Sequence, residues 1–248
     1  MIPVKGLAAA KSRLALPGSA EMAEAFLVDV LAAVRACPQV GAATVVTSAA
    51  DVADIARRAG ASVVPESATG INAAAAEGAA STEPGSPVVV LVADLPCLTA
   101  ALLSSVLTAA APFPASFLAD ADGLGTAMWC STSVPVRTEF GIGSRSAHAA
   151  SGAVDLVVEH PDARWEAARR DVDTAADLAD AAVLGVGQAT QARIADLAVV
   201  TVLSHRPDGV RIVDEQGRVQ RMEPPAGIGP LRAGQRLLRC GGQLLGLH

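Results

Sequence analysis

Over the first 110 residues, short β-branched hydrophobic runs alternate with longer stretches of helical spacing. Residues 88–93 (Val-Val-Val-Leu-Val-Ala) are apolar without alternation, which predicts a strand buried on both faces in the middle of a parallel sheet. Strands are expected at residues 1–4, 43–47, 62–64 and 88–93. Helices are expected at residues 20–36, 51–59, 70–80 and 98–110. This alternation predicts an α/β fold with a mostly parallel sheet and helices on both faces.

The pattern changes after residue 110. Further strands are expected at residues 115–119, 126–130, 153–158 and 166–170. Further helices are expected from Ser144 and at residues 175–184 and 188–194. From about Leu197 only short strands remain, separated by turns such as Pro207-Asp208-Gly209. We therefore predict a main domain at 1–196 and a small antiparallel β appendage, OB-like or cold-shock-like, at 197–248.

The composition of the chain disfavours some classes of function. The formal net charge of -6 disfavours general nucleic-acid binding. No Phe, Trp or Tyr follows Trp165, so the appendage lacks the aromatic platforms on which single strands stack. We expect a stabilising or dimerising appendage and no nucleic-acid partner. No apolar stretch is long enough to span a membrane, and the four widely spaced cysteines suit a reducing compartment, so we expect a cytoplasmic protein.

Several polar residues follow the predicted strands. Lys5, Lys11 and Arg13 come after the first strand and suit a polyphosphate, although a solvated basic surface is the plain alternative. Asp94 follows the central strand, where open α/β sheets bind ligands; it could also only cap the next helix. Asn72 could cap its own helix or reach a ligand.

A second group lies later in the chain. Phe140 to His148 is a glycine-containing loop that runs into a helix at Ser144, and backbone amides at a helix start favour anions. Asp171 and Asp173 follow the strand expected at 166–170. We expect His148 to be a loop or helix residue and not an acid–base group. Together these groups suit a phosphorylated substrate, a nucleoside triphosphate and Mg²⁺.

An ordered set of motifs carries a family resemblance. The set comprises Pro3-Val-Lys5, Ala10-Lys-Ser-Arg-Leu14, Asp94-Leu-Pro-Cys-Leu98, Gly125-Thr126, Phe140-Gly141 with Ser144, and Arg170-Asp-Val-Asp-Thr174. In this order they resemble the guanylyltransferases of deazaflavin coenzyme F-420 biosynthesis, over about residues 2–195. The resemblance implies a single nucleotidyltransferase α/β domain, similar to that of other sugar- and cofactor-nucleotidylyltransferases.

The resemblance also implies a reaction, in which phosphoenolpyruvate attacks the α-phosphorus of GTP and pyrophosphate is released. By resemblance, Asp94 and Asp171 hold Mg²⁺, with Asp173 as a third candidate ligand. Thr126, Gly141 and Ser144 would hold phosphoenolpyruvate. The residues expected at GTP are Lys5, Lys11 and Arg13 at the phosphates and Asn72 near the nucleoside.

Several alternatives stay open. The acid could be 2-phospho-L-lactate or 3-phosphoglycerate. The enzyme could be another nucleotidyltransferase, although Val4-Lys-Gly-Leu-Ala-Ala-Ala lacks the glycine-rich opening of cytidylyl- and molybdopterin-type enzymes. A nucleotide-binding regulatory protein is the non-enzymatic alternative. For partners, the resemblance suggests hand-over of the product to a downstream phospholactate transferase, and the appendage suggests a homodimer.

Overall fold

The computed structural model describes most of the chain. The described residues are 1–7, 14, 18–195, 198–207, 209–214, 216–223, 230–240 and 243–246. Lys11 and Arg13, two of the cations expected at a nucleotide, lie outside them. No described helix is long and apolar enough to cross a membrane.

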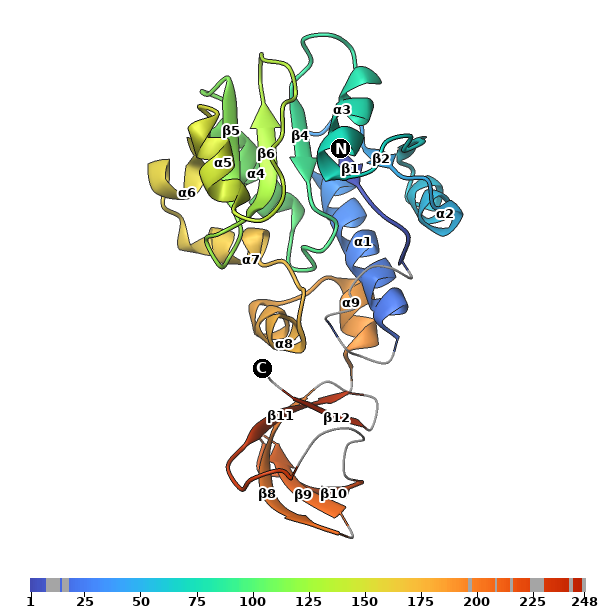
Figure 1. Cartoon of the computed structure of the whole chain (residues 1–248), viewed down its shortest axis with the longest axis vertical. Helices are drawn as coiled ribbons and strands as arrows, with labels where there is room; N and C mark the ends of the chain where they lie inside the picture. Colours follow the sequence, from blue (N-terminus) through green and yellow to red (C-terminus); the bar gives the residue numbers. More distant parts are fainter. Residues whose placement is uncertain are drawn as a thin grey trace.

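A central sheet organises the first part of the chain (Figure 1). The strands β1 (Ile2–Pro3), β2 (Thr44–Val46) and β3 (Ser62–Val64) pair in parallel. A second set lies in the order β4 (Val88–Leu91), β6 (Thr126–Ser131), β5 (Ala115–Ala119) and β7 (Val154–Asp155). In this set β6 is antiparallel to both neighbours, and β5 and β7 are parallel.

Two hydrogen bonds join the two sets of strands. The Met1 ammonium donates to the Val89 carbonyl at 2.8 Å, and the Leu91 amide donates to the Met1 carbonyl at 3.1 Å. In a parallel pair of strands, one residue bonds to two residues that lie two positions apart on its neighbour, as Met1 does to Val89 and Leu91. The strands therefore follow the order β3-β2-β1-β4-β6-β5-β7, which confirms the predicted mostly parallel α/β sheet.

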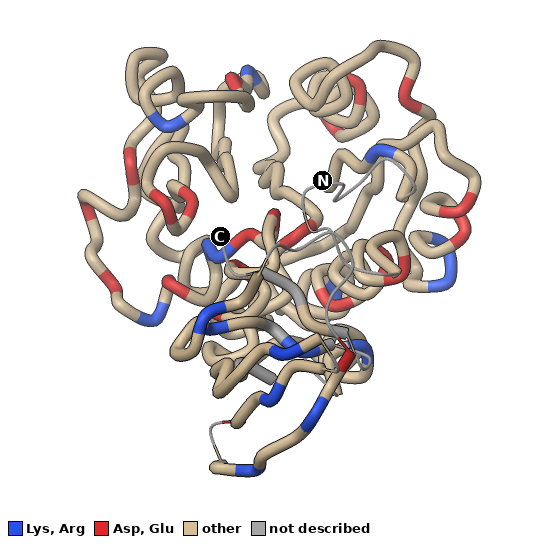
Figure 2. The backbone as a smooth tube through the Cα atoms, turned by 60° about the horizontal axis from the view of Figure 1, so that its bottom comes forward, with Lys and Arg blue, Asp and Glu red and all other residues tan. Residues whose placement is uncertain are grey.

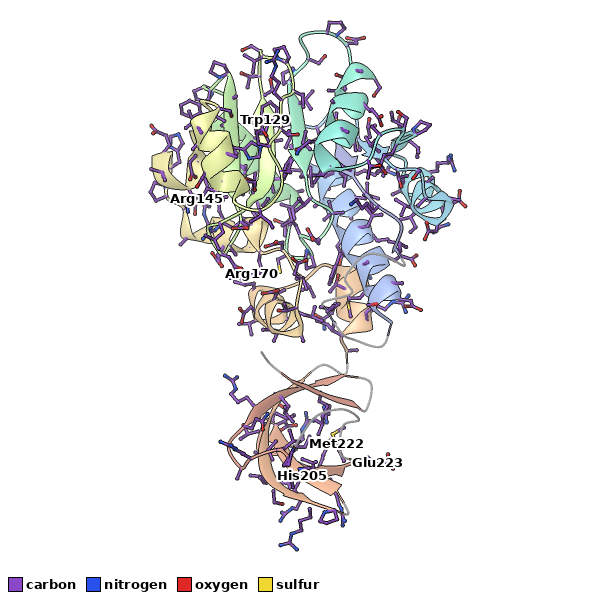
Figure 3. All side chains as sticks on the ribbon, in the orientation of Figure 1. Trp129, Arg145, Arg170, His205, Met222 and Glu223 are labelled. Atoms are coloured by element: carbon purple, nitrogen blue, oxygen red, sulfur yellow. The ribbon has the colours of Figure 1, made fainter. Side chains whose placement is uncertain are left out.

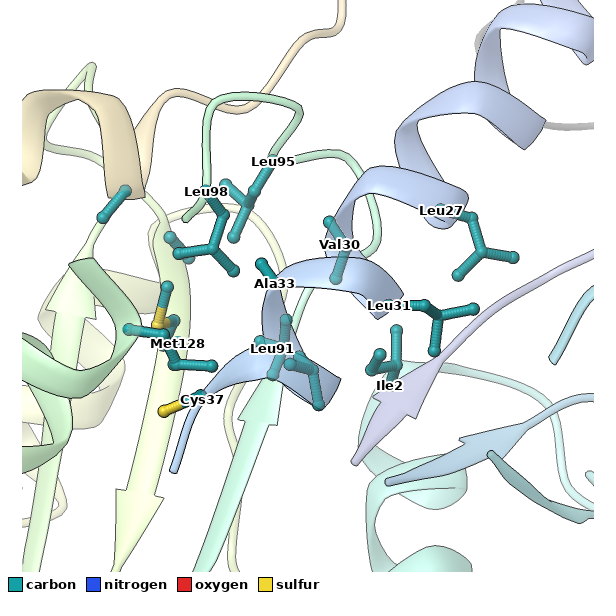
Figure 4. Packing of buried hydrophobic residues seen from close by; sticks show 14 of the residues in the cluster. Ile2, Leu27, Val30, Leu31, Ala33, Cys37, Leu91, Leu95, Leu98 and Met128 are labelled. Atoms are coloured by element: carbon teal, nitrogen blue, oxygen red, sulfur yellow. The ribbon is translucent and has the colours of Figure 1, made fainter. Parts of the chain in front are cut away.

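Helices cover both faces of this sheet because both faces of its strands are apolar. On one face, the helices α1 (Ser19–Ala36), α2 (Ala50–Arg58) and α4 (Ala100–Ala110) pack on residues such as Ile2, Leu91 and Met128. Figure 4 shows Leu27 and Leu31 of α1 beside Ile2. On the other face, α3 (Ile71–Ala80) packs with its small alanines on a cluster that includes Val90, Phe117 and Trp129.

One expected strand is shorter than predicted, and another is wrong. The segment expected as a strand at 153–158 is the two-residue β7 followed by helix α6 (Leu156–Glu159), because the Asp155 carboxylate accepts from the Val157 amide and caps a helix. Residues 166–170 form helix α7 (Glu166–Arg169), preceded by the 3-10 turn η3 (Ala163–Trp165). The pairing of Glu166 with Arg169 and Arg170, at i,i+3 and i,i+4, is the helical signal that the interpretation as a strand missed.

The last helices of the first domain lie at the end of the domain where α1 begins. The helix α8 (Ala175–Leu184) starts with a capping box made by Thr174 and Asp177, and α9 (Gln188–Arg193) lies along α1. Asp29 of α1 is 6% exposed and caps α9, accepting from the Ala189 amide at 2.9 Å and the Thr190 amide at 2.8 Å. A Cβ at Gly187 would lie 2.3 Å from the Asp29 Cγ, so glycine permits this close approach.

The remaining strands form a separate antiparallel sheet. Its order is β10 (Val219–Met222), β9 (Gly209–Asp214), β8 (Ala198–Arg206), β11 (Arg236–Cys240) and β12 (Gln243–Gly246). The strand β12 was missed by sequence reasoning. Residues such as Val200, Ile212 and Leu237 give this sheet its own small core. Figure 2 shows that basic residues, all of them arginine in the sequence, dominate its described charged positions, whereas acidic residues are spread over the first domain. The domain division at 196 and 197 stays a prediction.

The Asp29 cap yields a stability prediction. Asp29→Ala should destabilise the protein by about 3 kcal/mol, because two amides at the start of α9 lose a charged acceptor. The Tm should fall by roughly 6 to 12 °C in thermal unfolding followed by circular dichroism. Asp54→Ala is the matched control, since its pair with Arg57 is exposed and should contribute under about 0.5 kcal/mol. Equal Tm values for the two variants would contradict this role of Asp29.

Candidate active site

Three aspartates converge at the carboxyl end of the central strand. Asp94 lies in the loop after β4, and the Val172 amide donates to the Asp94 carbonyl at 3.1 Å, which places Asp171 beside this loop. Burial, followed by the charges of Asp94 and Asp120, raises the pKa of Asp171 from 3.8 to about 7. The two aspartates predicted as metal ligands are therefore brought together, and Asp120 joins them.

Asp94 does not cap the following helix. Thr99 is the N-cap residue of α4 and accepts from the Leu102 amide at 3.2 Å. The capping alternative for Asp94 is therefore wrong, and its carboxylate sits at the strand end, where α/β sheets bind ligands.

Asp120 was missed by sequence reasoning. It directly follows β5, and its carboxylate accepts from the Leu124 amide at 3.0 Å across a tight turn. A Cβ at Gly125 would lie 2.2 Å from the Asp120 Oδ2 and 3.7 Å from the Ser144 Oγ. Its position in the sequence could have identified it, because Asp120 directly follows an apolar strand segment, as Asp94 does.

The element that precedes Asp171 differs from the predicted one. Asp171 follows helix α7, not a strand, and the Arg169 carbonyl accepts from both the Ala121 amide (2.9 Å) and the Asp171 amide (3.2 Å). Arg169 also donates from its side chain to the Asp120 carbonyl. Backbone bonds to one carbonyl therefore hold the segments of Asp120 and Asp171 together.

Asp173 and Arg170 flank the three aspartates. Asp173 is exposed, its amide donates to the Asp177 carboxylate at 3.1 Å, and its charge is the weakest of those that raise the pKa of Asp171. Arg170, labelled in Figure 3, pairs with Glu166 at 2.7 Å and lies 3.7 Å from the Asp122 carboxylate. The Arg170 guanidinium is thus directed at Glu166 and Asp122.

The donor set suits a hard cation. Among the described residues no group of three or more His, Cys, Asp or Glu is arranged to hold a metal ion. Magnesium, however, usually takes one or two protein carboxylates and completes its shell with water and substrate phosphates. Burial and then the charges of Asp94 and Asp120 raise the pKa of Asp171, and a divalent cation would favour the ionised form of this carboxyl group. Asp94 and Asp171 therefore fit Mg²⁺.

A cluster of hydroxyl groups adjoins the carboxylates. Thr126, on β6, and Ser144, the first residue of α5 (Ser144–Ala150), are 6% and 2% exposed. The Ser144 hydroxyl donates to the Thr126 hydroxyl at 3.2 Å, and the Thr126 oxygen lies 2.9 Å from the His148 Nδ1. The structure thus brings together Thr126 and Ser144, two of the residues predicted for the acid substrate, and it places His148 inside helix α5.

The loop before α5 is clamped from both sides. On one side Asn72 of α3 accepts from the Phe140 amide at 2.8 Å and donates to the Phe140 carbonyl at 2.9 Å. On the other side the Glu139 amide donates to the His148 Nε2 at 2.7 Å. The expectation that Asn72 caps its helix is wrong, since Gly70 is the N-cap and no side chain caps α3. The Asn72 amide group holds this loop instead.

Gly141 follows the clamped residues and turns the chain toward α5. Its φ of +142° is one that L side chains rarely adopt, although nothing lies within 4 Å of an added Cβ. The Gly141 carbonyl accepts from the Ser144 amide at 3.1 Å, so this amide is already engaged within the loop. Arg145, labelled in Figure 3, fixes the other side of α5 by pairing with Asp155 at 2.8 Å and donating to the Gly123 carbonyl at 3.0 Å.

Of the predicted phosphate-binding cations, only Lys5 is described. It is exposed and follows β1, close in sequence to the Val4 amide that bonds to Val46. Its position at a strand end agrees with the sequence interpretation, and the role of Lys5 in binding nucleotide stays a prediction.

Comparison with known proteins gives a consistent family. A family described as "Guanylyl transferase CofC like" matches residues 1–216. A phosphoenolpyruvate guanylyltransferase of Salinispora arenicola is 46% identical over 198 residues, covering 77% of this chain and 90% of that protein. The protein of the same name from Streptomyces coelicolor is 44% identical over 213 residues, covering 80% and 96%. That from Mycolicibacterium gilvum is 40% identical over 204 residues, covering 78% and 93%.

The raised pKa of Asp171 predicts that the free energy of unfolding decreases as the pH rises. Between pH 3.8 and about 7 the folded protein holds a proton on Asp171 that the unfolded chain releases. The stability from this group is therefore complete below pH 4 and is lost as the pH rises through 7, by roughly 4 kcal/mol in all. Asp171→Asn should raise the Tm by several degrees at pH 8 and leave it unchanged at pH 4 in metal-free thermal unfolding.

Asp173→Asn is the control for this experiment, since Asp173 is exposed and should give a much smaller difference. Added Mg²⁺ should raise the Tm of the wild-type protein at pH 8 more than that of Asp171→Asn. A Tm of Asp171→Asn that follows the wild-type value at both pH values would show that the Asp171 carboxylate carries no such cost.

Proposed function

Since the chain belongs to the guanylyl transferase CofC-like family, we propose that it transfers the guanylyl group of GTP to phosphoenolpyruvate in coenzyme F-420 biosynthesis. The observation that carries the proposal is the contact between the two clusters. Asp120 and Ser144 both approach Gly125, so the carboxylates and the hydroxyl groups form one continuous site. Such a site can hold a metal–triphosphate and a small phosphorylated acid side by side.

The chemistry needs positioning more than proton transfer. A phosphate oxygen of the acid forms a bond to the α-phosphorus of GTP while the bond between the α- and β-phosphates breaks and pyrophosphate leaves. The attacking phosphate is already anionic at neutral pH, so no general base is required. In-line placement of the two phosphates and neutralisation of their charges account for the catalysis.

The roles of individual residues follow from the resemblance and from chemistry. Asp94 and Asp171 would hold Mg²⁺, which would offset the charge of the triphosphate as pyrophosphate departs. Asp173 is a weaker candidate ligand because it is exposed. Thr126, Ser144 and Gly141 would form the acid site, with the Thr126 hydroxyl and the Gly141 backbone amide as its donors. Lys5, Lys11 and Arg13 would bind the GTP phosphates.

Asn72 is the predicted residue whose proposed role changes most. Both polar atoms of its side-chain amide bond to the loop 138–140. If the nucleoside binds near Asn72, this side chain acts on it through the loop. The assignment to the nucleoside stays a proposal.

Three further proposals concern partners and location. Hand-over of the reactive diphosphate product to a downstream phospholactate transferase would limit its hydrolysis. A homodimer through the β8–β12 sheet would explain a sheet with so small a core of its own. A cytoplasmic location agrees with the buried free thiols of Cys37, Cys97 and Cys130.

The experiment that tests the function is a pyrophosphate-release assay. It crosses GTP, ATP, CTP and UTP with phosphoenolpyruvate, 2-phospho-L-lactate and 3-phosphoglycerate. We expect GTP with phosphoenolpyruvate to give the highest kcat/KM, and turnover to require Mg²⁺. A preference for another nucleotide or acid would identify a different nucleotidyltransferase, and release with no pair would favour the nucleotide-binding regulatory protein.

A carboxylate variant connects the assay to the site. Asp94→Asn should lower kcat by about a hundredfold or more at saturating Mg²⁺, because a metal carboxylate contributes several kcal/mol to the transition state. Asp122→Asn is the matched control on the same edge, with a side chain that is 73% exposed, and should keep turnover within about threefold. Near wild-type turnover in Asp94→Asn would remove this residue from the metal site.

Gly141→Val tests the assignment of the acid substrate. The change places a β-branched residue at a φ of +142° beside the amide proposed to bind the acid, so the KM for phosphoenolpyruvate should rise about tenfold or more. The KM for GTP should change much less in the same kinetic assay. Gly152→Val is the control, since Gly152 also has a positive φ, +88°, and open space around it. Equal kinetic effects of the two substitutions would mean that strain alone is responsible.

A further inference from the structure

His148 is a buried polar residue to which the proposed chemistry assigns no task. Its side chain is 0% exposed and lies between Phe117 and Phe140, with ring centroids 5.6 and 5.3 Å away. Its two nitrogens contact different parts of the site. Nδ1 lies 2.9 Å from the Thr126 hydroxyl, and Nε2 accepts from the Glu139 amide at 2.7 Å.

The contact with Glu139 determines which nitrogen carries the proton. A backbone amide can only donate, so Nε2 must be the unprotonated nitrogen. In a neutral imidazole the hydrogen then lies on Nδ1. The Nδ1–H group faces the Thr126 oxygen, which therefore accepts from it.

The Thr126 oxygen then accepts twice, from His148 and from the Ser144 hydroxyl at 3.2 Å. A threonine hydroxyl has two lone pairs and one hydrogen, so both lone pairs are occupied. In the described part of the chain no acceptor receives the remaining Thr126 hydrogen. The hydroxyl can only donate to a further group, and a carboxylate or phosphate oxygen is the acceptor that benefits most.

We propose that His148 is a positioning residue that holds Thr126 as a hydrogen-bond donor to the anionic acid substrate. The inference rests on the proposed function, in which Thr126 touches the acid. His148 itself touches neither substrate nor metal; it determines the direction of a hydroxyl group that does. The sequence carried no sign of this, because Thr126 and His148 are 22 residues apart and meet only through the packing of α5 on β6.

The surroundings keep the imidazole neutral. Burial lowers the pKa of His148, while the charge of Glu139 and the Ser144 carbonyl act in the opposite direction. The two phenylalanine rings that pack on the imidazole carry no charge. Protonation would place a hydrogen on Nε2 facing the Glu139 amide hydrogen, and would break the clamp on the loop.

Two substitutions separate the two contacts of His148. His148→Asn keeps an N–H group at the position of Nδ1 and loses the acceptor for Glu139. His148→Gln keeps an acceptor at the position of Nε2 and loses the donor to Thr126. We expect His148→Gln to raise the KM for phosphoenolpyruvate about tenfold, and His148→Asn to raise it by less than about threefold. The KM for GTP should be unchanged in both variants.

A double-mutant cycle with Thr126→Ala tests whether the effect passes through Thr126. We expect His148→Gln to add no further rise in KM when Thr126 is already alanine, because the hydroxyl that it orients is gone. A merely structural role would instead lower the Tm and alter both KM values in both histidine variants. Additive effects, or a larger rise in His148→Asn than in His148→Gln, would overturn the proposal.

Nitrogen NMR of the labelled full-length protein gives a readout that does not depend on turnover. At pH 7 the chemical shifts of the His148 nitrogens should report a neutral ring with the hydrogen on Nδ1, in the free protein and after addition of phosphoenolpyruvate. A hydrogen on Nε2, or a charged ring, would overturn the tautomer and with it the proposal. Absence of pyrophosphate release with an Nδ1–H signal intact would instead contradict the proposed function.

Discussion

Three aspartates lie close together at one edge of an apolar sheet. The rest of the candidate site depends on the interactions that hold these like charges in place. Asp94, Asp120 and Asp171 come from three separate segments, and burial, followed by the charges of the other two aspartates, raises the pKa of Asp171 to about 7. Folding can bring such groups together only if other interactions hold the segments in place. Backbone hydrogen bonds do this: the Ala121 and Asp171 amides donate to the Arg169 carbonyl, and the Val172 amide donates to the Asp94 carbonyl.

The half of the site proposed to bind the acid contains neutral hydrogen-bonded groups in place of clustered charges. Its polar groups are neutral and hydrogen-bonded to one another: Ser144 donates to Thr126, His148 contacts Thr126, and Asn72 and His148 hold the loop 138–140. Such a neutral network tolerates burial and keeps its side chains in one orientation. The loop that ends at Gly141 is therefore fixed before a ligand arrives, whereas the carboxylates are left with charge that a cation can neutralise.

The two halves meet at Gly125. Its missing side chain lets the Asp120 carboxylate and the Ser144 hydroxyl approach the same point of the backbone. A larger residue at position 125 would collide with the Asp120 carboxylate. The family resemblance and the 40 to 46% identity to named phosphoenolpyruvate guanylyltransferases connect this geometry with a transfer between two phosphorylated substrates.

The sequence by itself determined the α/β class, the strand 62–64, the helix 175–184 and most other elements of the first domain, because hydrophobic period and capping residues act locally. The family resemblance proposed Asp94, Asp171, Thr126, Ser144 and Gly141 as site residues, and the structure brings Asp94 close to Asp171 and Thr126 close to Ser144. Sequence reasoning failed at residues 166–170, where helical charge pairs outweighed a short strand-like pattern, and it passed over Asp120 and β12. Only the tertiary structure decided that Asp120 joins the carboxylates and that His148 orients Thr126, since those contacts join residues far apart in sequence whose approach depends on the packing of whole elements.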